Sequence, residues 1–371
     1  MMKSLLSLVL TGALLGTSAH AAFDLGNGAS LAVTADAGVK YNDNIFLSSS
    51  NAKSDSILDL APGLSLQVGG ESLLQSTVSF SEDFQHYTDT SNLDTGLAKA
   101  DLISAYDDGK MKLNVNAWFH QANQATRDVR GGNFLARRDL IHGDVTDEVA
   151  LTEKTSVSAG AGWDDTDYKR AGYVSWQWWE LPLKYYYKIE PKLDLSAGFR
   201  YRNNELDAGG LDSTEYFYSI GARGELAPKA EGEVNIGLNQ QRLARGGTRE
   251  GLGIDSSVNY EVSPKSTVLF GIRNGYGYSS GGDSYRDFGL NGGFSSNISD
   301  NLRVSATLGY DKYSYITGQK DDFYQGQLGG TYLVNANVSV TGSYTYAKDK
   351  SNFPGASFKN NIFGVSAALR F

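Results

Sequence analysis

Histidines are the scarcest candidates for acid–base chemistry in this chain. Of its 4 histidines, His86, His120 and His142 lie beyond the first 21 residues. Asp144 follows His142 by two positions, and side chains two apart on a strand share a face, so this is the best acid–base pair available. No Gly-x-Ser-x-Gly motif accompanies the pair, and with 0 cysteines the chain has no thiolate nucleophile. We therefore predict that the protein is not an enzyme.

Acidic residues form the second candidate cluster. Asp164, Asp165 and Asp167 could offer oxygen ligands to a surface Ca²⁺, but they lack the ligand spacing of an EF-hand loop, and we favour a solvated strand end. The formal net charge is −9 and the basic residues are scattered, which argues against a nucleic-acid-binding face. We expect no metal or other cofactor.

Strands of alternating polarity must position all of these residues. In the last nine residues, Phe363, Val365, Ala367, Leu369 and Phe371 share one face, and small or polar residues occupy the other. A strand with one apolar and one polar face suits a sheet that has lipid outside and water inside. The same alternation recurs at residues 31–40, 193–202, 252–262 and 338–346. We therefore predict an all-β fold, an antiparallel up-and-down transmembrane β-barrel with the apolar set facing lipid.

Both ends of the chain are consistent with export to the outer membrane of a Gram-negative bacterium. Lys3, an apolar run over residues 5–15 and Ala19-His20-Ala21 predict a signal peptide at residues 1–21, which leaves a single barrel domain at 22–371. The final strand resembles the C-terminal signal strand of bacterial outer-membrane barrels. That resemblance implies that Phe363, Val365, Leu369 and Phe371 are recognised by the barrel assembly machinery.

Tight polar turns recur about 35 to 45 residues apart, a spacing that leaves room for two spanning strands and one looser loop. They lie at residues 69–71, 107–110, 152–155, 190–192, 227–229, 263–265, 299–301 and 335–337. Nine hairpins, or about 18 strands, follow from them. The alternative is 16, because the parity that exposes Val145 between residues 137 and 151 also exposes Asp147. With both termini in the periplasm, the tight turns are periplasmic and the loops extracellular.

Charged residues on the inner face should govern what passes through such a barrel. Parity turns a set of basic side chains inward, namely Lys184, Lys188, Arg200, Arg202, Arg223, Arg273 and Arg303. Inward acids on other strands would give a transverse field that orients polar solutes, or the charges would only hold the wall rigid. A barrel of this size has an aqueous lumen, and the sequence shows no plug domain or long inserting loop, so we expect an open or loosely gated pore.

Aromatic and basic segments suggest further partners. Tyrosines near the strand ends, together with Tyr41 and Phe46, are predicted to form girdles among the membrane lipids. The run Trp176-Gln-Trp178-Trp179 is either girdle, which we favour, or a platform on which sugar rings stack. The basic stretch at residues 127–138 is a candidate contact for lipopolysaccharide phosphates or acidic polysaccharide.

The segment Tyr41-Asn42-Asp43-Asn44-Ile45-Phe46 follows the first strand. It resembles the Tyr-x-Asp-Asn-hydrophobic signature of an outer-membrane β-barrel porin family that is often encoded with exopolysaccharide biosynthesis genes. The resemblance implies a role in exopolysaccharide export or in passage of related saccharides. From the residues alone, Asn42, Asp43 and Asn44 read as a polar turn, with a cation site as the alternative. The competing functions are a structural or adhesive barrel with a closed lumen and, more remotely, a barrel-embedded hydrolase.

Overall fold

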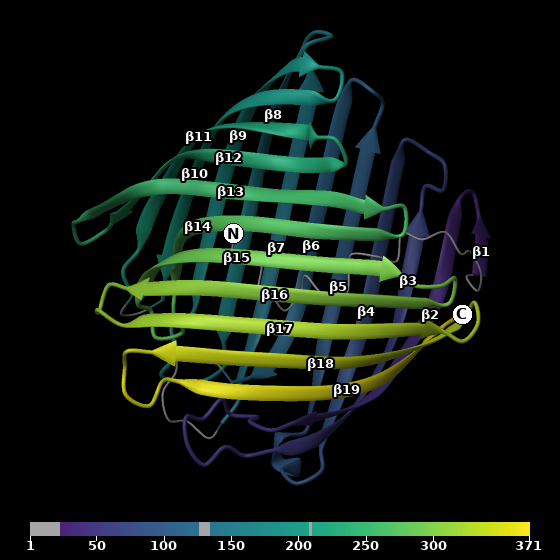
Figure 1. The fold of residues 1–371 in the computed structure, drawn as a ribbon, viewed down its shortest axis with the longest axis vertical. Helices are drawn as coiled ribbons and strands as arrows, with labels where there is room; N and C mark the ends of the chain where they lie inside the picture. The colour runs from purple at the N-terminus through teal and green to yellow at the C-terminus, as the bar shows by residue number, and fades with distance from the viewer. Residues whose placement is uncertain (1–22, 126–133, 208–209) are drawn as a thin grey trace.

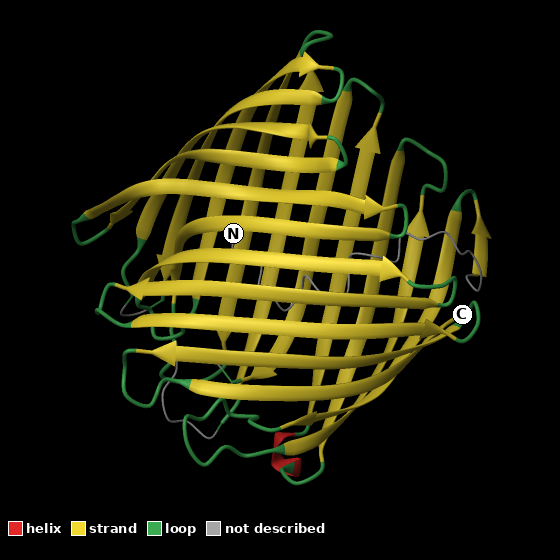
Figure 2. Ribbon diagram, in the orientation of Figure 1, coloured by secondary structure: helices red, strands yellow, loops and turns green. Residues whose placement is uncertain are grey.

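The computed structural model describes residues 23–125, 134–207 and 210–371. The predicted signal peptide and residues 127–133 of the basic stretch lie outside these ranges. Among the described residues, no helix is long and apolar enough to cross a membrane. Almost everything described is strand (Figure 2), and the short 3₁₀ turn η1 (Ser91–Leu93) lies in one loop.

Eighteen long strands build the wall, and the described part of the chain adds one short strand before them, β1 (Phe23–Gly26), which pairs with the start of β2. The long strands are β2 (Ala29–Asn42), β3 (Asp55–Val68), β4 (Leu74–Tyr87), β5 (Thr95–Asp107), β6 (Met111–Gln124), β7 (Ala136–Ala150), β8 (Thr155–Tyr168), β9 (Trp176–Glu190), β10 (Leu193–Leu206), β11 (Ser213–Ala227), β12 (Ala230–Leu243), β13 (Thr248–Ser263), β14 (Ser266–Tyr278), β15 (Ser284–Asn297), β16 (Leu302–Tyr315), β17 (Lys320–Leu333), β18 (Val338–Ser351) and β19 (Phe358–Arg370).

Each of these strands pairs antiparallel with the next, and β19 pairs with β2 to close the barrel. Figure 1 shows the two walls crossing, with β2–β7 behind and β13–β19 in front, as expected when barrel strands tilt strongly. The predicted barrel with 18 strands is confirmed, and the alternative of 16 is wrong.

All eight predicted tight turns connect neighbouring strands at one end of the barrel, which is called the periplasmic end below. In the first of them, Gly69 adopts a φ of +108°, and a Cβ there would lie 2.1 Å from the Leu74 carbonyl oxygen. Only glycine fits this turn. The looser connections lie at the opposite, extracellular end.

Alternation along the strands separates the two faces as predicted. Ile220 and Leu308 are 67% and 70% exposed on the outer face, where lipid covers them in a membrane. The doubtful segment around Asp147 is regular, because β7 pairs with β6 and β8 without a register shift. Asp147 therefore shares the outer face with Val145 and lies three residues before the strand ends at Ala150.

Two prolines interrupt their ladders, as the missing N–H of proline would lead one to expect from sequence. The pairing of β3 with β4 omits Ala61 and Pro62, and the pairing of β8 with β9 omits Pro182, although the register continues on both sides. A proline has no N–H to give to a ladder, so one bond is lost without displacing the strand.

Candidate functional site

Carboxylates accompany the inward basic residues that the sequence singled out. Arg223 of β11 donates to both Glu148 oxygens at 2.5 and 2.6 Å and to Asp194 at 3.0 Å. Lys184 of β9 lies 2.5 Å from Glu233 of β12. These partners belong to strands that are one to four positions away around the wall. Inner side chains therefore meet across the curve of the barrel rather than standing apart on a uniform basic surface.

The second group of basic residues centres on one carboxylate. Arg202 is 4% exposed and donates to Glu180 at 2.6 Å, while its guanidinium lies over the Trp178 ring. Arg200 contacts the same carboxylate at 3.8 Å and Asp255 at 3.8 Å. A buried guanidinium needs such a partner, because an unpaired buried charge is costly.

The remaining predicted lining residues, Arg273, Lys188 and Arg303, differ in their partners and in their position along the barrel axis. Arg273 donates to Asp311 at 2.7 Å and also binds Asp287. Lys188 is exposed near the periplasmic turn, and Arg303 donates to Asn297 at 2.9 Å at the same end. Five paired acids were missed in the sequence, although the same parity places them inward: Glu180, Asp194, Glu233, Asp287 and Asp311.

Two of the three candidate histidines, His120 and His142, face the lumen beside a tryptophan, whereas His86 is exposed and contacts Asp94 at 2.7 Å. Trp118 lies 4.6 Å from His120 and 5.3 Å from His142 between ring centroids, with nearly parallel planes. His142 lies between Asp144 at 2.7 Å and Asp164 at 2.8 Å. His120 contacts Asp101 at 2.8 Å. The wall of β5–β8 therefore carries an inner aromatic and imidazole stack bordered by carboxylates.

The extracellular loop that carries the family-like signature is fastened to the closing strands. Asp43 receives hydrogen bonds from the Asn361 backbone and side-chain amide at 2.7 and 2.6 Å. Asn44, which is 2% exposed, donates to the Ser48 and Lys359 carbonyls at 2.9 Å. These contacts extend the β2–β19 seam beyond its last ladder pair. They fit the predicted polar turn.

The last two residues of the signature pack inward over the wall. Ile45 is buried against Ile57, Tyr87 and Leu135, and Phe46 packs against the same cluster. Phe46 is therefore not a girdle residue, and that prediction is wrong. Its alternation was misread because the chain has already left the strand at Asn42.

A second inward-packed region involves the tip of the β14–β15 hairpin. Tyr278 packs against Trp176 and Trp178, which point into the barrel, and its hydroxyl donates to Ser213 at 2.5 Å. The predicted continuous girdle over residues 176–179 is thus wrong for two of its three tryptophans, and only Trp179 lies exposed on the outer face. The sequence predicted no plug domain and no long inserting loop, and it did not show that the short tip of this hairpin occupies part of the lumen.

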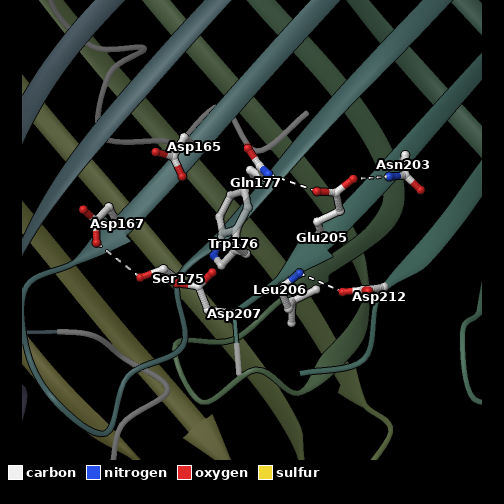
Figure 3. Close-up of a pocket in the computed structure, with 10 residues that line it drawn as sticks. All are labelled: Asp165, Asp167, Ser175, Trp176, Gln177, Asn203, Glu205, Leu206, Asp207 and Asp212. Atoms are coloured by element: carbon white, nitrogen blue, oxygen red, sulfur yellow. Dashed lines mark hydrogen bonds between the residues drawn. The ribbon is translucent and has the colours of Figure 1, made fainter. Parts of the chain in front are cut away.

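The described residues include a pocket of about 610 Å³ at the extracellular rim, where β8, β9 and β10 end (Figure 3). Five carboxylates line it: Asp165, Asp167, Glu205, Asp207 and Asp212. Asp164 points the other way, towards His142, so the predicted acidic cluster is divided between two faces. Hydrogen bonds from Lys169 to Asp167 and Asp139 raise the pKa of its ammonium. Within the described ranges, no group of three or more ligating side chains is placed to hold a metal ion.

The comparison with protein families decides the identity. Residues 31–371 match the model of a family described as "Putative beta-barrel porin 2". The chain belongs to this family. It is a protein of the Gram-negative outer membrane. No curated protein matches the chain.

Outer-membrane proteins of known structure are similar to this chain at low sequence identity. OpdK of Pseudomonas aeruginosa, crystallised with vanillate, has a TM-score of 0.50 and 11% identity, and the match covers 92% of this chain and 99% of that one. OpdQ of the same organism has a TM-score of 0.48 and 11% identity, with 92% and 98% covered. The siderophore receptor PirA of P. aeruginosa has a TM-score of 0.47 and 10% identity, with 92% and 80% covered. At these identities the likeness concerns the fold.

Proposed function

We propose that this family member is a channel for polar solutes in the outer membrane, with saccharides as the preferred class. The observation that carries the proposal is the inner face of a closed barrel of 18 strands, which presents paired charges and hydroxyls rather than a continuous apolar core. A barrel of this size encloses an aqueous space unless its own chain fills it. Facing opposite charges suit hydrated, dipolar solutes.

The stack at Trp118 supports the preference for saccharides. Aromatic faces contact pyranose rings, and carboxylates accept hydrogen bonds from sugar hydroxyls. Trp118 is partly exposed on the inner wall, and Asp101 and Asp144 border it. A polysaccharide or its fragments would meet both chemistries there. The exopolysaccharide pathway is the proposed physiological setting.

Charge replacement tests the channel. The variant with Lys184, Arg200, Arg202 and Arg223 all changed to Gln leaves Glu148, Glu180 and Glu233 without their partners. We expect the zero-current potential in a salt gradient to shift towards cation preference, because unpaired carboxylates attract cations. The mirror variant with those three glutamates changed to Gln should shift it towards anions. An unchanged potential in both variants would contradict a conducting path along these residues.

A tryptophan pair tests the saccharide preference. Trp118→Ala should weaken current block by a neutral oligosaccharide, because it removes the aromatic face from the lumen. Trp163→Ala is the matched control, since Trp163 lies on the outer face at the lipid boundary. Equal block in wild type and Trp118→Ala would remove saccharides from the proposal while leaving conduction in place.

The inward-packed loops favour a second candidate, a structural or adhesive barrel with a shut lumen. The cluster around Ile45 and the β14–β15 tip both occupy the extracellular half. Wild-type protein and all the variants above would then be silent in bilayers. A catalytic role has weaker support, since His142 is held by two aspartates and no serine hydroxyl is hydrogen-bonded to it among the described contacts.

A further inference from the structure

One seam of the barrel is open over its extracellular half. The ladder between β13 and β14 ends at Asp255↔Arg273, so residues 248–254 and 274–278 do not pair across it. The flanking ladders continue, with β12–β13 paired as far as Arg242↔Thr248 and β14–β15 as far as Tyr278↔Ser284. The gap therefore belongs to this interface and not to its neighbours. A shorter gap lies at β5–β6, whose ladder ends at Lys99↔His120 and leaves four residues of each strand unpaired at the same end. Figure 1 shows β14 curving away behind the wall near its extracellular end while β13 runs on.

The outer face of the β14–β15 tip lies against the inner face of the preceding strands. Tyr278 and Ser284 are paired across the hairpin, and both reach inward-facing residues: Ser213 of β11 from Tyr278, and Gln241 of β12 from Ser284. The Tyr276 hydroxyl donates to the Arg249 carbonyl at 3.1 Å. Because outer-face residues contact inner-face residues, the edge at β14 is rolled inside the wall that ends at β13.

The opposite face of the tip fills the space towards the next strands. Tyr285 packs edge-on against Tyr313 and Tyr315 of β16, at 5.1 and 5.2 Å between ring centroids. The loop at the tip also crosses to the loop between β8 and β9, where the Val174 N–H donates to the Ser280 carbonyl at 2.9 Å. The rolled edge therefore narrows the extracellular half of the lumen and joins two loops from distant parts of the wall.

Side chains bond several of the backbone groups that the open seam leaves unpaired on the β13 edge. Asn274 donates from Nδ2 to the Leu252 carbonyl at 2.6 Å, and its Oδ1 accepts from the Ile254 N–H at 2.8 Å. Arg286 donates to the same Leu252 carbonyl at 3.2 Å. A bare strand edge is very unfavourable within a membrane. These bonds stand in for ladder bonds, so they reduce the difference in free energy between an open and a paired seam.

The sequence on both sides of the gap is compatible with pairing. Continuing the register of Asp255↔Arg273 would set Leu252 opposite Tyr276 on the outer face, with Gly253 opposite Gly275 and Gly251 opposite Gly277 on the inner face. Tyr276 would then lie at the level of the lipid headgroups, where tyrosine is stable. The inner glycines would add no side chains to the lumen.

We propose that the rolled-in β14–β15 edge is a gate of the channel. In the rolled state the tip obstructs the extracellular half of the lumen. In the paired state, residues 249–254 of β13 form an antiparallel ladder with residues 274–279. The tip then becomes part of the wall, and the lumen is wider at its extracellular end. The proposal rests on the proposed function as a channel, since it assigns the moving part of that channel.

A disulfide that holds the tip in place tests the gate. A Cβ at Gly282 would lie 3.3 Å from the Val174 Cβ, close to the separation of about 3.5–4.5 Å in disulfides. The protein has 0 native cysteines, so V174C/G282C carries the only two thiols. Because Gly282 has a φ of +82°, V174C/S280C serves as a second pair without that strain. Ser266→Cys with Ser296→Cys is the matched control, because these hydroxyls are 2.8 Å apart at the periplasmic end of β14–β15, which stays paired in both states.

Oxidised V174C/G282C or V174C/S280C should lose most channel openings in planar bilayers, and dithiothreitol should restore them. The control pair should conduct equally in both conditions. Heat-modifiable migration on gels checks that every variant is folded. If oxidised V174C/G282C and oxidised V174C/S280C both conducted like the wild type, the gate would be overturned and the channel would remain supported. Silence of wild type, reduced variants and control alike would overturn the channel and the gate with it.

Discussion

Two seams of this barrel differ at the same extracellular end. The seam that joins the chain's first and last long strands, β2–β19, continues past its ladder through Asp43, Asn44 and Asn361. The ladder of the seam in the middle of the chain, β13–β14, stops at Asp255↔Arg273, so the extracellular half of this seam is unpaired. The β2–β19 seam, which joins the two ends of the chain, therefore has additional hydrogen bonds. The β13–β14 seam joins strands that a short turn already holds together, and it is open.

The residues at each seam explain the difference. At the β2–β19 seam, the short polar side chains of Asp43 and Asn44 form hydrogen bonds with the backbone of β19. At the β13–β14 seam, Gly251, Gly253, Gly275 and Gly277 offer no cross-strand side-chain pairs, which are the main stabilising unit of a sheet. The aromatic residues of the tip, Tyr278 and Tyr285, pack inside the barrel.

Removal of Phe371 should have the largest effect on this comparison. Its N–H and carbonyl bond Val33 of β2 at 2.8 and 2.6 Å, so it completes the periplasmic end of the closing seam. We expect deletion of Phe371, or Phe371→Lys, to abolish assembly and leave the protein to periplasmic proteolysis. Immunoblots of outer-membrane fractions measure this. Normal amounts of heat-modifiable barrel would contradict the role of the closing strand.

Asn44→Ala should give an intermediate effect by removing the buried amide at the extracellular end of the same seam. Its two donated bonds and the one it accepts from the Ser48 N–H would be lost, at a cost of about 2–3 kcal/mol of unfolding free energy. Urea unfolding in detergent or lipid measures the loss. Asn259→Ala, on an exposed site of β13, is the control and should change stability little. If both variants behaved alike, the signature would not fasten the seam.

Asn274→Ala should give the smallest change in stability but a clear change in gating. Losing the two bonds to β13 should cost about 1–2 kcal/mol and favour the state in which backbone pairing replaces them. We expect longer open times in single-channel records of Asn274→Ala. Its midpoint of urea unfolding should change less than that of Asn44→Ala. Shorter open times would mean that Asn274 supports the paired state instead.

The periodic features of this fold were predictable from sequence, because each depends on neighbouring residues. The eight turns, the two faces and the interruptions at Pro62 and Pro182 follow from local geometry. Alternation also places Tyr276 and Tyr278 on the outer face of their hairpin, which is correct locally. It does not show that this face rolls against Ser213 and Trp178, since that depends on contacts between strands far apart in the chain.

The candidate pore shows the same limit. Parity turned Arg202 and Arg223 inward, yet it did not identify Glu180 and Glu148 as their partners. Arg223 and Glu148 belong to strands four positions apart, so their meeting depends on the curvature of the wall. Pairing is therefore a property of the closed barrel, and only the candidate residues are visible in the sequence.

Planar-bilayer recording of the purified wild-type protein tests the central claim most directly. A channel whose lumen is partly obstructed by a movable edge should give discrete openings, with closures that become rarer in Asn274→Ala. Absence of any conductance from folded wild type and from folded Asn274→Ala would contradict the account and favour a barrel with a shut lumen.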